Sequence, residues 1–166
     1  MSTLRLALRP FLPADTPVLA ALFTAAILEL TGEDYDLDQQ EAWAAAAEDE
    51  VAFGERLGAL LTLVAVRAGT VVGFVAVKDN AHIEMLYVHP EAAGSGVGKA
   101  LCDAAETLAR ARGTTALSVD ASDTALGFFQ HRGYVPERRN TVARGNAWLG
   151  TTTLRKTLGE EKARLQ

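Results

Sequence analysis

Three alternating glycines stand between a strand-like and a helix-like segment, and this short loop constrains the chain more than any other feature. Gly94, Gly96 and Gly98 follow the apolar residues 82–88 and precede a helical pattern that includes Val97. Glycine lets the backbone approach a ligand closely and adopt dihedral angles that other residues avoid. The free N–H groups and the dipole of a helix start favour an anion. The loop therefore predicts a phosphate site, with a pyrophosphate as the natural ligand.

Three other interpretations compete for this loop. A P-loop requires glycine where Ala93 stands and Ser or Thr where Ala100 stands. A Rossmann fingerprint requires glycine at Lys99 and closes the first strand of a βαβ unit, although Asp120 lies at about the spacing of its ribose-binding acid. A tight turn without a ligand is the plainest alternative, and the loop residues alone leave it open.

The hydrophobic pattern predicts one α/β domain with a mixed, mostly antiparallel, twisted sheet flanked by helices. The strand–helix–strand order around residues 94–119 implies one parallel pair within that sheet. We expect a single domain over residues 1–166, with a frayed tail over 158–166. The expected order is a strand, two helices, three strands, a helix, a strand, a helix and two strands, at about 4–9, 16–30, 38–50, 61–66, 71–77, 82–88, 97–112, 117–119, 124–132, 134–139 and 148–155.

Composition excludes several classes of function. The 166 residues suit one core, and 16 basic against 21 acidic residues argue against binding to a nucleic-acid backbone. Cys102 is the only cysteine and three histidines show no metal-ligand spacing, so we predict no disulfide and no metal. The N-terminus lacks a signal-peptide pattern, and the longest apolar stretch, 60–66, is too short to cross a bilayer. We predict a cytoplasmic protein without membrane association.

Two motifs in the right order connect the chain to a known family. Residues 93–98 read Ala-Gly-Ser-Gly-Val-Gly, and residues 122–134 read Ser-Asp-Thr-Ala-Leu-Gly-Phe-Phe-Gln-His-Arg-Gly-Tyr. With the pair Gly73-Phe74 after a strand, they resemble the GCN5-related N-acetyltransferases, the GNAT family. The resemblance covers residues 71–134, and within the family the chain is most similar to the YafP-like branch.

The resemblance implies an activity, a co-substrate and a set of binding residues. It implies transfer of an acetyl group from acetyl-coenzyme A to a primary amine by direct attack while both substrates are bound. The sheet is expected to splay at residues 86–88, where the backbone would pair with pantetheine, and homodimers are common in such families. The expected cofactor-binding residues are Leu86, Tyr87, Val88, Ala93, Gly94, Ser95, Gly96, Val97, Gly98, Lys99, Ser122, Phe128 and Phe129.

Glu84 is the predicted general base. An alkyl amine is mostly protonated at neutral pH, so the reaction needs a group that accepts a proton. In strict alternation Glu84 shares a strand face with Leu86 and Val88, opposite Tyr87, and His82 lies on the same face as the second catalytic candidate. The non-catalytic interpretations are a half-exposed strand carboxylate and a solvated histidine beside a turn.

Two positions depart from the family pattern. Ala93 stands where Gln or Arg is usual, so one side chain is missing from the loop and main-chain N–H groups are expected to hold the ligand. Phe129 stands where many members have the tyrosine proposed as general acid, and we expect it to pack against the cofactor instead. These departures keep a second class of function open, a degenerate, non-catalytic acyl-coenzyme A-binding or interaction module.

The acceptor is expected between the first two helices. Trp43, Tyr35 and the acidic residues of 33–38 fall there, which suggests a cationic amine; helix packing and a solvated loop are the alternatives. Ser122 suits either a cofactor contact or a helix N-cap. Cys102 is interpreted as a small buried thiol rather than as the carrier of an acyl intermediate.

Overall fold

A single seven-stranded sheet organises the protein, in the order β1-β2-β3-β4-β5-β7-β6. The computed structural model describes residues 5–159. Every neighbouring pair is antiparallel except β4–β5, which is parallel. The mixed sheet predicted from the sequence is therefore confirmed. The strands are β1 (Leu6–Pro10), β2 (Leu61–Arg67), β3 (Thr70–Lys78), β4 (His82–Val88), β5 (Ala116–Ser122), β6 (Val135–Arg144) and β7 (Ala147–Thr157).

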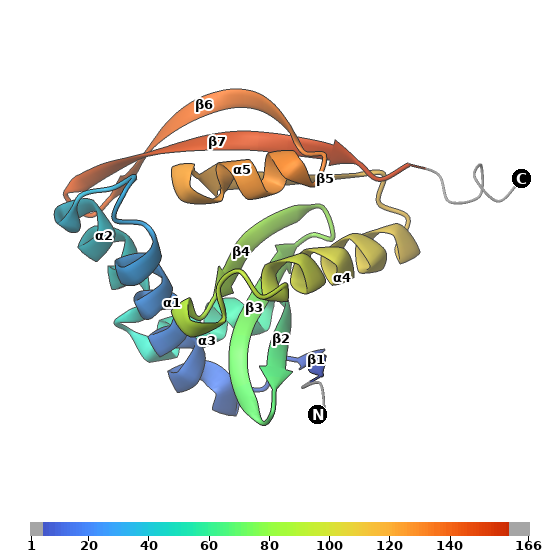
Figure 1. Cartoon of the computed structure of the whole chain (residues 1–166), viewed down its shortest axis with the longest axis horizontal. Helices are drawn as coiled ribbons and strands as arrows, with labels where there is room; N and C mark the ends of the chain where they lie inside the picture. Colours follow the sequence, from blue (N-terminus) through green and yellow to red (C-terminus); the bar gives the residue numbers. More distant parts are fainter. Residues whose placement is uncertain (1–4, 160–166) are drawn as a thin grey trace, which may run out of the picture.

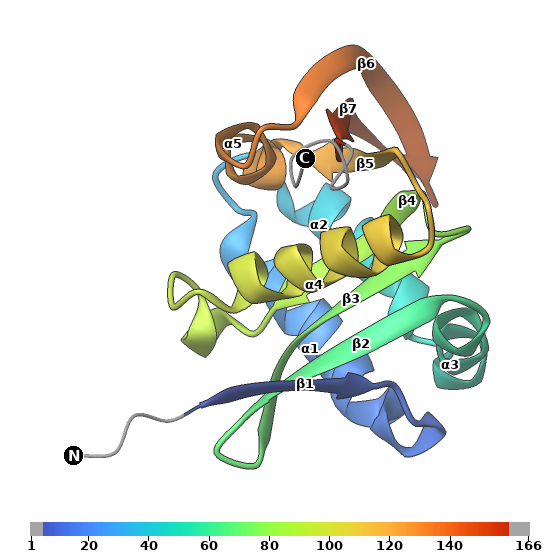
Figure 2. The ribbon, with the colours of Figure 1, turned by 90° about the vertical axis from the view of Figure 1, so that its right-hand side faces the viewer.

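Helices cover both faces of the sheet and form two cores. On one face α4 and α5 pack over Val75, Leu117 and Leu154, and on the other α1 and α3 pack over Phe74 and Met85. Figure 2 shows α4 in front of β2–β4, with α1 behind these strands. In Figure 1 the hairpin β6–β7 lies at the top and the β2–β4 half of the sheet lies below it. The helices are α1 (Thr16–Leu30), α2 (Leu37–Ala44), α3 (Glu50–Ala59), α4 (Val97–Ala111) and α5 (Asp123–His131), with short 3-10 turns η1 (Pro13–Asp15), η2 (Ala45–Ala47) and η3 (Pro90–Ala92).

The prediction of one helix over residues 38–50 is wrong. The chain forms α2, the turn η2 and a separate helix α3 that continues to Ala59. Asp49 separates α2 and η2 from α3. Its side chain accepts a hydrogen bond from the backbone N–H of Ala52 and so caps α3. Asp is favoured at an N-cap and unfavourable inside a helix, so the cap outweighs the alanine-rich pattern around it.

The two strands predicted at 61–66 and 71–77 are confirmed as β2 and β3, which form an antiparallel hairpin. Ala68 and Gly69 both have positive φ, 52° and 78°, as a two-residue hairpin turn of the I′ type requires. Arg67 and Thr70 are paired across the hairpin, and Leu6 of β1 pairs with Arg67 from the other side. The end of β2 is thus held by strands on both edges.

Gly73 sets the distance between α4 and the sheet. A Cβ placed on Gly73 would lie 2.9 Å from the Val97 side chain, 3.0 Å from the Leu101 side chain and 3.0 Å from the carbonyl oxygen of Tyr87. Real Cβ atoms essentially never come closer than 3.0 Å to another atom, and contacts at 3.0 Å are already unusually tight. The absence of a side chain therefore lets the start of α4, and the glycine loop before it, lie tightly against β3 and β4.

Gly73→Ala is expected to destabilise the protein by about 1–3 kcal/mol, because the added methyl group overpacks this contact. Urea denaturation of both proteins measures the change. The control is Gly127→Ala in α5, where a Cβ meets no atom within 4 Å and should stabilise the helix by about 0.5–1 kcal/mol. Equal stabilities for Gly73→Ala and wild type would show that α4 moves freely away from the sheet.

One helical stretch, Pro13–Leu30, is long and apolar enough by length and composition to cross a membrane, so the expectation that 60–66 is the longest apolar stretch is wrong. Within it Leu19, Leu22 and Ile27 are at most 2% exposed and belong to the core on the α1 face. Burial against the sheet explains the apolar character of this helix.

Two predictions concern residues at the ends of the chain that the structure does not fully describe. Leu4, the first residue of the predicted first strand, lies outside the described residues. Leu158, the first residue of the predicted tail, is 1% exposed, and its N–H donates to the carbonyl oxygen of Thr115. Residues 160–166 of that tail lie outside the described residues. The frayed tail and the single domain over the full length stay predictions.

Candidate active site

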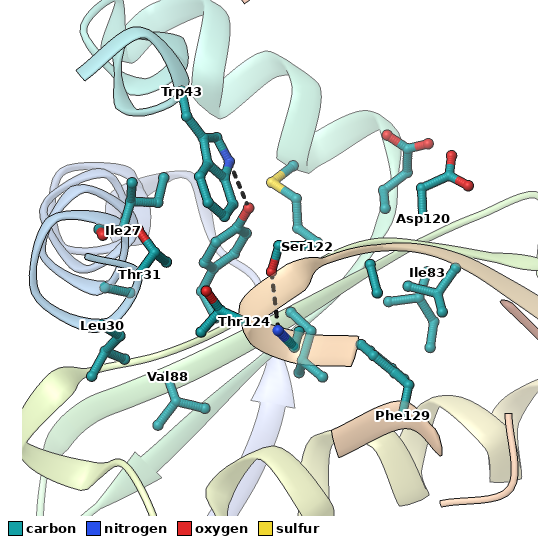
Figure 3. A pocket seen from close by; sticks show the side chains of 18 residues that line it. Ile27, Leu30, Thr31, Trp43, Ile83, Val88, Asp120, Ser122, Thr124 and Phe129 are labelled. Atoms are coloured by element: carbon teal, nitrogen blue, oxygen red, sulfur yellow. Dashed lines mark hydrogen bonds between the residues drawn. The ribbon is translucent and has the colours of Figure 1, made fainter. Parts of the chain in front are cut away.

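The sheet opens between β4 and β5. These strands are paired only at His82 with Ser118 and at Ile83 with Val119, and they diverge beyond that point. A cavity of about 190 Å³ occupies the opening, between α1, α2, the ends of β4 and β5, and α5. Figure 3 shows Trp43 pointing into this cavity from the α2 side, with Val88 and Phe129 on the opposite side. The predicted splay at residues 86–88 is therefore present.

The glycine loop joins β4 to α4 in the conformation that its glycines predict. Gly94 and Gly96 have φ of 76° and 91°, and Gly96 is the N-cap residue of α4. A Cβ on either would meet no heavy atom within 4 Å, so their backbone is accessible. Val97 instead is 1% exposed and packs into the core, and Lys99 forms an ion pair with Asp103 at 3.3 Å. The Ser95 N–H donates to the carbonyl oxygen of Ala92 at 3.3 Å, so the N–H groups of Gly94 and Gly96 are the donors of this segment that are open to an anion.

Glu84 does not share a face with Leu86 and Val88, and this part of the sequence analysis is wrong. The register of β4 against β3 shifts between Ile83 and Met85, so Glu84 is the extra residue of a β-bulge. Leu86 and Val88 consequently pack on the α4 face, whereas Met85 packs on the α1 face. Glu84 points to the α1 face too, where it accepts a hydrogen bond from Arg56 of α3 at 3.1 Å.

Tyr87 accordingly lies on the same face as Glu84, not on the opposite one. Its hydroxyl oxygen accepts a hydrogen bond from the indole N–H of Trp43 at 3.1 Å, and its ring contacts Phe23 and Phe74. Burial raises the pKa of Tyr87 to about 12, so the phenol stays protonated at neutral pH. Trp43 and Tyr87 form an aromatic wall of the cavity.

His82 lies between two carboxylates, as Glu84 and Asp120 each have an oxygen 3.8 Å from its Nε2. Its Nδ1 is 2.7 Å from the Ser118 hydroxyl oxygen, which is also placed to donate to the carbonyl oxygen of Ala81 at 3.4 Å. The Ser118 contact accommodates either neutral tautomer, because the hydroxyl can donate to Nδ1 or accept from it. The two predicted catalytic residues are thus adjacent, with Asp120 as a third titratable group.

The cofactor-side residues of α5 have defined structural partners. The Ser122 hydroxyl oxygen accepts a hydrogen bond from the N–H of Ala125, which is the N-cap role considered for it, and Ser122 also lines the cavity. Phe129 is 2% exposed and packs on Phe128 while still lining the cavity. The Phe128 ring lies 3.6 Å from where a Cβ of Gly98 would stand. The Phe128 ring therefore connects α5 to the start of α4, and Phe129 packs behind it.

Cys102 and Tyr134 are buried on the α4 face and do not line the cavity. The Tyr134 hydroxyl donates to Glu106 at 2.9 Å, and the Cys102 sulfur lies 3.7 Å from that hydroxyl. Burial raises the pKa of the Cys102 thiol to about 11 and raises that of Tyr134 as well. A protonated, enclosed thiol is a poor nucleophile, which supports the interpretation of Cys102 as a structural residue.

The acidic segment before α2 is only partly available to a substrate. Asp34 accepts a hydrogen bond from the Thr124 hydroxyl at 2.8 Å, and Asp36 caps α2 through the N–H of Gln39. Tyr35 is buried, donates to the carbonyl oxygen of Gly150 and accepts from the N–H of Asp123. These residues fix α2 against β7 and α5, whereas Glu33 and Asp38 are exposed.

Two residues beside the site were missed in the sequence. Asp120 was considered only as the ribose-binding acid of a Rossmann fold, and Arg56 was not considered. Aligning the parallel strands would have placed Asp120 close to Glu84, since both follow a paired residue by two positions. Arg56 lies on α3, beyond the end of the helix predicted over 38–50, so no signal pointed to its contact. Across residues 5–159, no arrangement of three or more His, Cys, Asp or Glu side chains could hold a metal ion.

Comparison with known proteins identifies the family. Residues 31–152 match the acetyltransferase (GNAT) domain family. The chain is 32% identical over 142 residues to the "Uncharacterized N-acetyltransferase YafP" of Escherichia coli K12, covering 86% of this chain and 89% of the relative. A crystal structure from Rhodopseudomonas palustris, described as a "GCN5-Related N-acetyltransferase: Aminotransferase, Class-II", is 54% identical with a TM-score of 0.90, over 95% of this chain and 97% of that one.

A more distant structure shares the fold. The PaiA N-acetyltransferase of Thermoplasma acidophilum in complex with coenzyme A is 18% identical with a TM-score of 0.75, over 92% of this chain and 99% of that one. The glycine loop, the opened sheet and these matches lead to one conclusion: the chain belongs to the GCN5-related N-acetyltransferase (GNAT) family and is an N-acetyltransferase.

Proposed function

We propose that this protein moves an acetyl group from acetyl-coenzyme A to a primary amine of a small molecule or peptide, by direct attack while both substrates are bound. The observation that carries the proposal is the cavity between β4 and β5. One wall carries the carboxylates of Glu84 and Asp120, and the other is formed by Leu86, Val88 and Phe129. An apolar thioester arm and a charged amine could therefore meet there.

The donor side of the proposal rests on the loop and on the edge of β4. Beyond Ile83 no residue of β4 pairs with β5 within the part of the chain that the structure describes, so that edge is available to the amide groups of pantetheine. The short turn η3 connects β4 to the accessible backbone of Gly94 and Gly96, which suits a diphosphate. The coenzyme A complex of the Thermoplasma structure supports the same ligand.

Glu84 is the proposed proton acceptor, acting directly or through water, with His82 as the alternative. The leaving group is an alkyl thiolate whose conjugate acid has a pKa near that of cysteine, about 8.5. Such a group leaves near neutral pH without a strong acid. The positive end of α5, which begins at Asp123 beside the cavity, would stabilise the developing charge. Phe129 cannot donate a proton, and Tyr134 is engaged by Glu106 outside the cavity.

A cationic acceptor is the proposed substrate class. Glu84 and Asp120 place two acidic groups at the α1 side of the cavity, and Arg56 is the basic side chain that contacts Glu84. Trp43 and Tyr87 add aromatic faces suited to an alkylammonium group. The net charge of −5 would also attract such a substrate.

Release of free coenzyme A with a panel of amines tests this function. We expect spermidine and a lysine-containing peptide to have lower KM values than aspartate, and the KM for these cations to rise with salt. Asp120→Asn should raise the KM for the cationic amine and leave the KM for acetyl-coenzyme A unchanged. Coenzyme A binding without turnover on any amine would instead support the non-catalytic binding module.

A further inference from the structure

The glycine loop carries no basic side chain of its own. No Lys or Arg occurs between Lys78 and Lys99, and Ala93 occupies the position where a basic or amide side chain was expected. Lys99 itself is paired with Asp103 of the same helix at 3.3 Å. A diphosphate held only by main-chain N–H groups would have no positively charged partner. The residues of the loop itself do not provide one.

Arg67, distant in the sequence, lies against the loop. Its Nη1 donates to the Ser95 hydroxyl oxygen at 3.0 Å and its Nη2 lies 3.4 Å from the Ser95 carbonyl oxygen. Ser95 stands between Gly94 and Gly96, whose accessible backbone forms the anion site described above. The guanidinium is therefore next to the centre of the loop.

The hairpin fixes the backbone from which this guanidinium extends. Arg67 is the last residue of β2, and its backbone is paired with Leu6 on one side and Thr70 on the other. Within residues 5–159 no carboxylate lies within ion-pair distance of Arg67. A guanidinium has five N–H donors, of which the contacts with Ser95 use two.

We propose that Arg67 binds the diphosphate of coenzyme A and so replaces, from the β2–β3 hairpin, the side chain that the loop lacks at Ala93. The proposal rests on the proposed function for its ligand. It assigns Arg67 to the nucleoside diphosphate part of the cofactor, because a planar, unpaired guanidinium beside exposed N–H groups suits phosphate oxygens.

Three ligands separate this role from the alternatives. Coenzyme A and 3′-dephospho-coenzyme A both contain the diphosphate, whereas S-acetylpantetheine lacks it. Arg67→Ala should weaken binding of the first two by about five- to twentyfold in calorimetry, the scale of one partly exposed charged hydrogen bond. The kcat/KM for S-acetylpantetheine should stay within about twofold of the wild-type value, since no phosphate is present to lose.

Two further variants control the experiment. Arg112→Ala removes an exposed arginine that donates to Asn80 at the other end of α4 and should leave binding unchanged. Adding Ala93→Arg to Arg67→Ala should restore most of the lost affinity, because it returns a guanidinium to the loop.

The contrary results are distinct. Equal losses with S-acetylpantetheine would mean that Arg67 only shapes the loop, and a loss limited to coenzyme A would assign it to the 3′-phosphate. Unchanged binding in Arg67→Ala would remove Arg67 from the site altogether. Any of these overturns the proposal, whereas a wild-type protein that binds none of the ligands would contradict the proposed function itself.

Discussion

Glu84→Gln is expected to lower kcat by about 10²- to 10⁴-fold at neutral pH, the usual contribution of a general base. Glutamine keeps the size of the side chain and a hydrogen bond acceptor for Arg56, which donates to Glu84 at 3.1 Å. The variant therefore removes the proton acceptor with little change in packing. Steady-state kinetics with a cationic amine at saturating acetyl-coenzyme A measure the loss.

The pH dependence separates a base from a binding group. An alkyl amine has a pKa of about 10.4, so a larger share of the acceptor is already neutral as the pH rises. The deficit of Glu84→Gln should then shrink between pH 7 and 10. A binding role for the carboxylate would raise KM instead and would keep the wild-type pH profile of kcat.

Neighbouring variants identify the group that acts. His82→Gln and Asp120→Asn remove the other two titratable groups of this cluster. The His82 Nε2 lies 3.8 Å from a carboxylate oxygen of Glu84 and 3.8 Å from one of Asp120. Glu55→Gln removes an exposed carboxylate of α3 outside the cavity and should leave kcat unchanged. If His82→Gln shows the larger, pH-dependent loss, the histidine Nε2 is the base and Glu84 serves only to orient it.

Most of the strands and the conformation of the glycine loop could be predicted because local chemistry determines them. Gly94 and Gly96 adopt the positive φ that the sequence pattern favours, and a tight turn at Ala68-Gly69 joins the two expected strands. Gly73 belongs to the same class, since a missing side chain in an apolar strand indicates close approach. Such features depend on a few adjacent residues and leave a clear trace in the sequence.

The orientation of Glu84 could not be predicted in the same way. No glycine or proline occurs within 82–88, so strict alternation was the natural expectation. The bulge is defined by the register against β3, which shifts between Ala76 and Val77. It places Glu84 on the α1 face, toward Arg56, and Leu86 on the α4 face. The single extra residue in β4 therefore gives the cavity one acidic wall and one apolar wall. The position of this bulge depends on the pairing of β4 with β3, which the sequence of β4 alone does not reveal.

The break after α2 shows the limit of helix propensity. Residues 44–47 are four alanines, the residue with the highest helix propensity, yet the chain changes to a 3-10 turn there. Asp49 was a visible cap signal, but its effect depends on Phe53 and Leu57 being buried against the sheet. Packing of α3 thus decides where the helix ends, and it brings Arg56 to the site.

Gly96→Glu is expected to weaken acetyl-coenzyme A binding by more than about 100-fold while the fold is retained. Gly96 has a φ of 91°, which an L-residue adopts only at a cost of about 1–2 kcal/mol. A Cβ there meets no protein atom within 4 Å, so the new side chain extends toward the position proposed for the diphosphate. Two negative charges about 5 Å apart repel by about 3 kcal/mol at an effective dielectric constant of 20.

The matched control isolates the backbone strain from the lost anion site. Gly113, at the other end of α4, has a φ of 84° and equally open surroundings. Gly96→Ala and Gly113→Ala should therefore lower the melting temperature by similar amounts, but only the variants at position 96 should lose affinity in calorimetry, with Glu worse than Ala. Charge and shape at the loop would then account for the difference, because strain is common to both positions. Binding of Gly96→Glu at the wild-type affinity would contradict the assignment of this loop to the diphosphate.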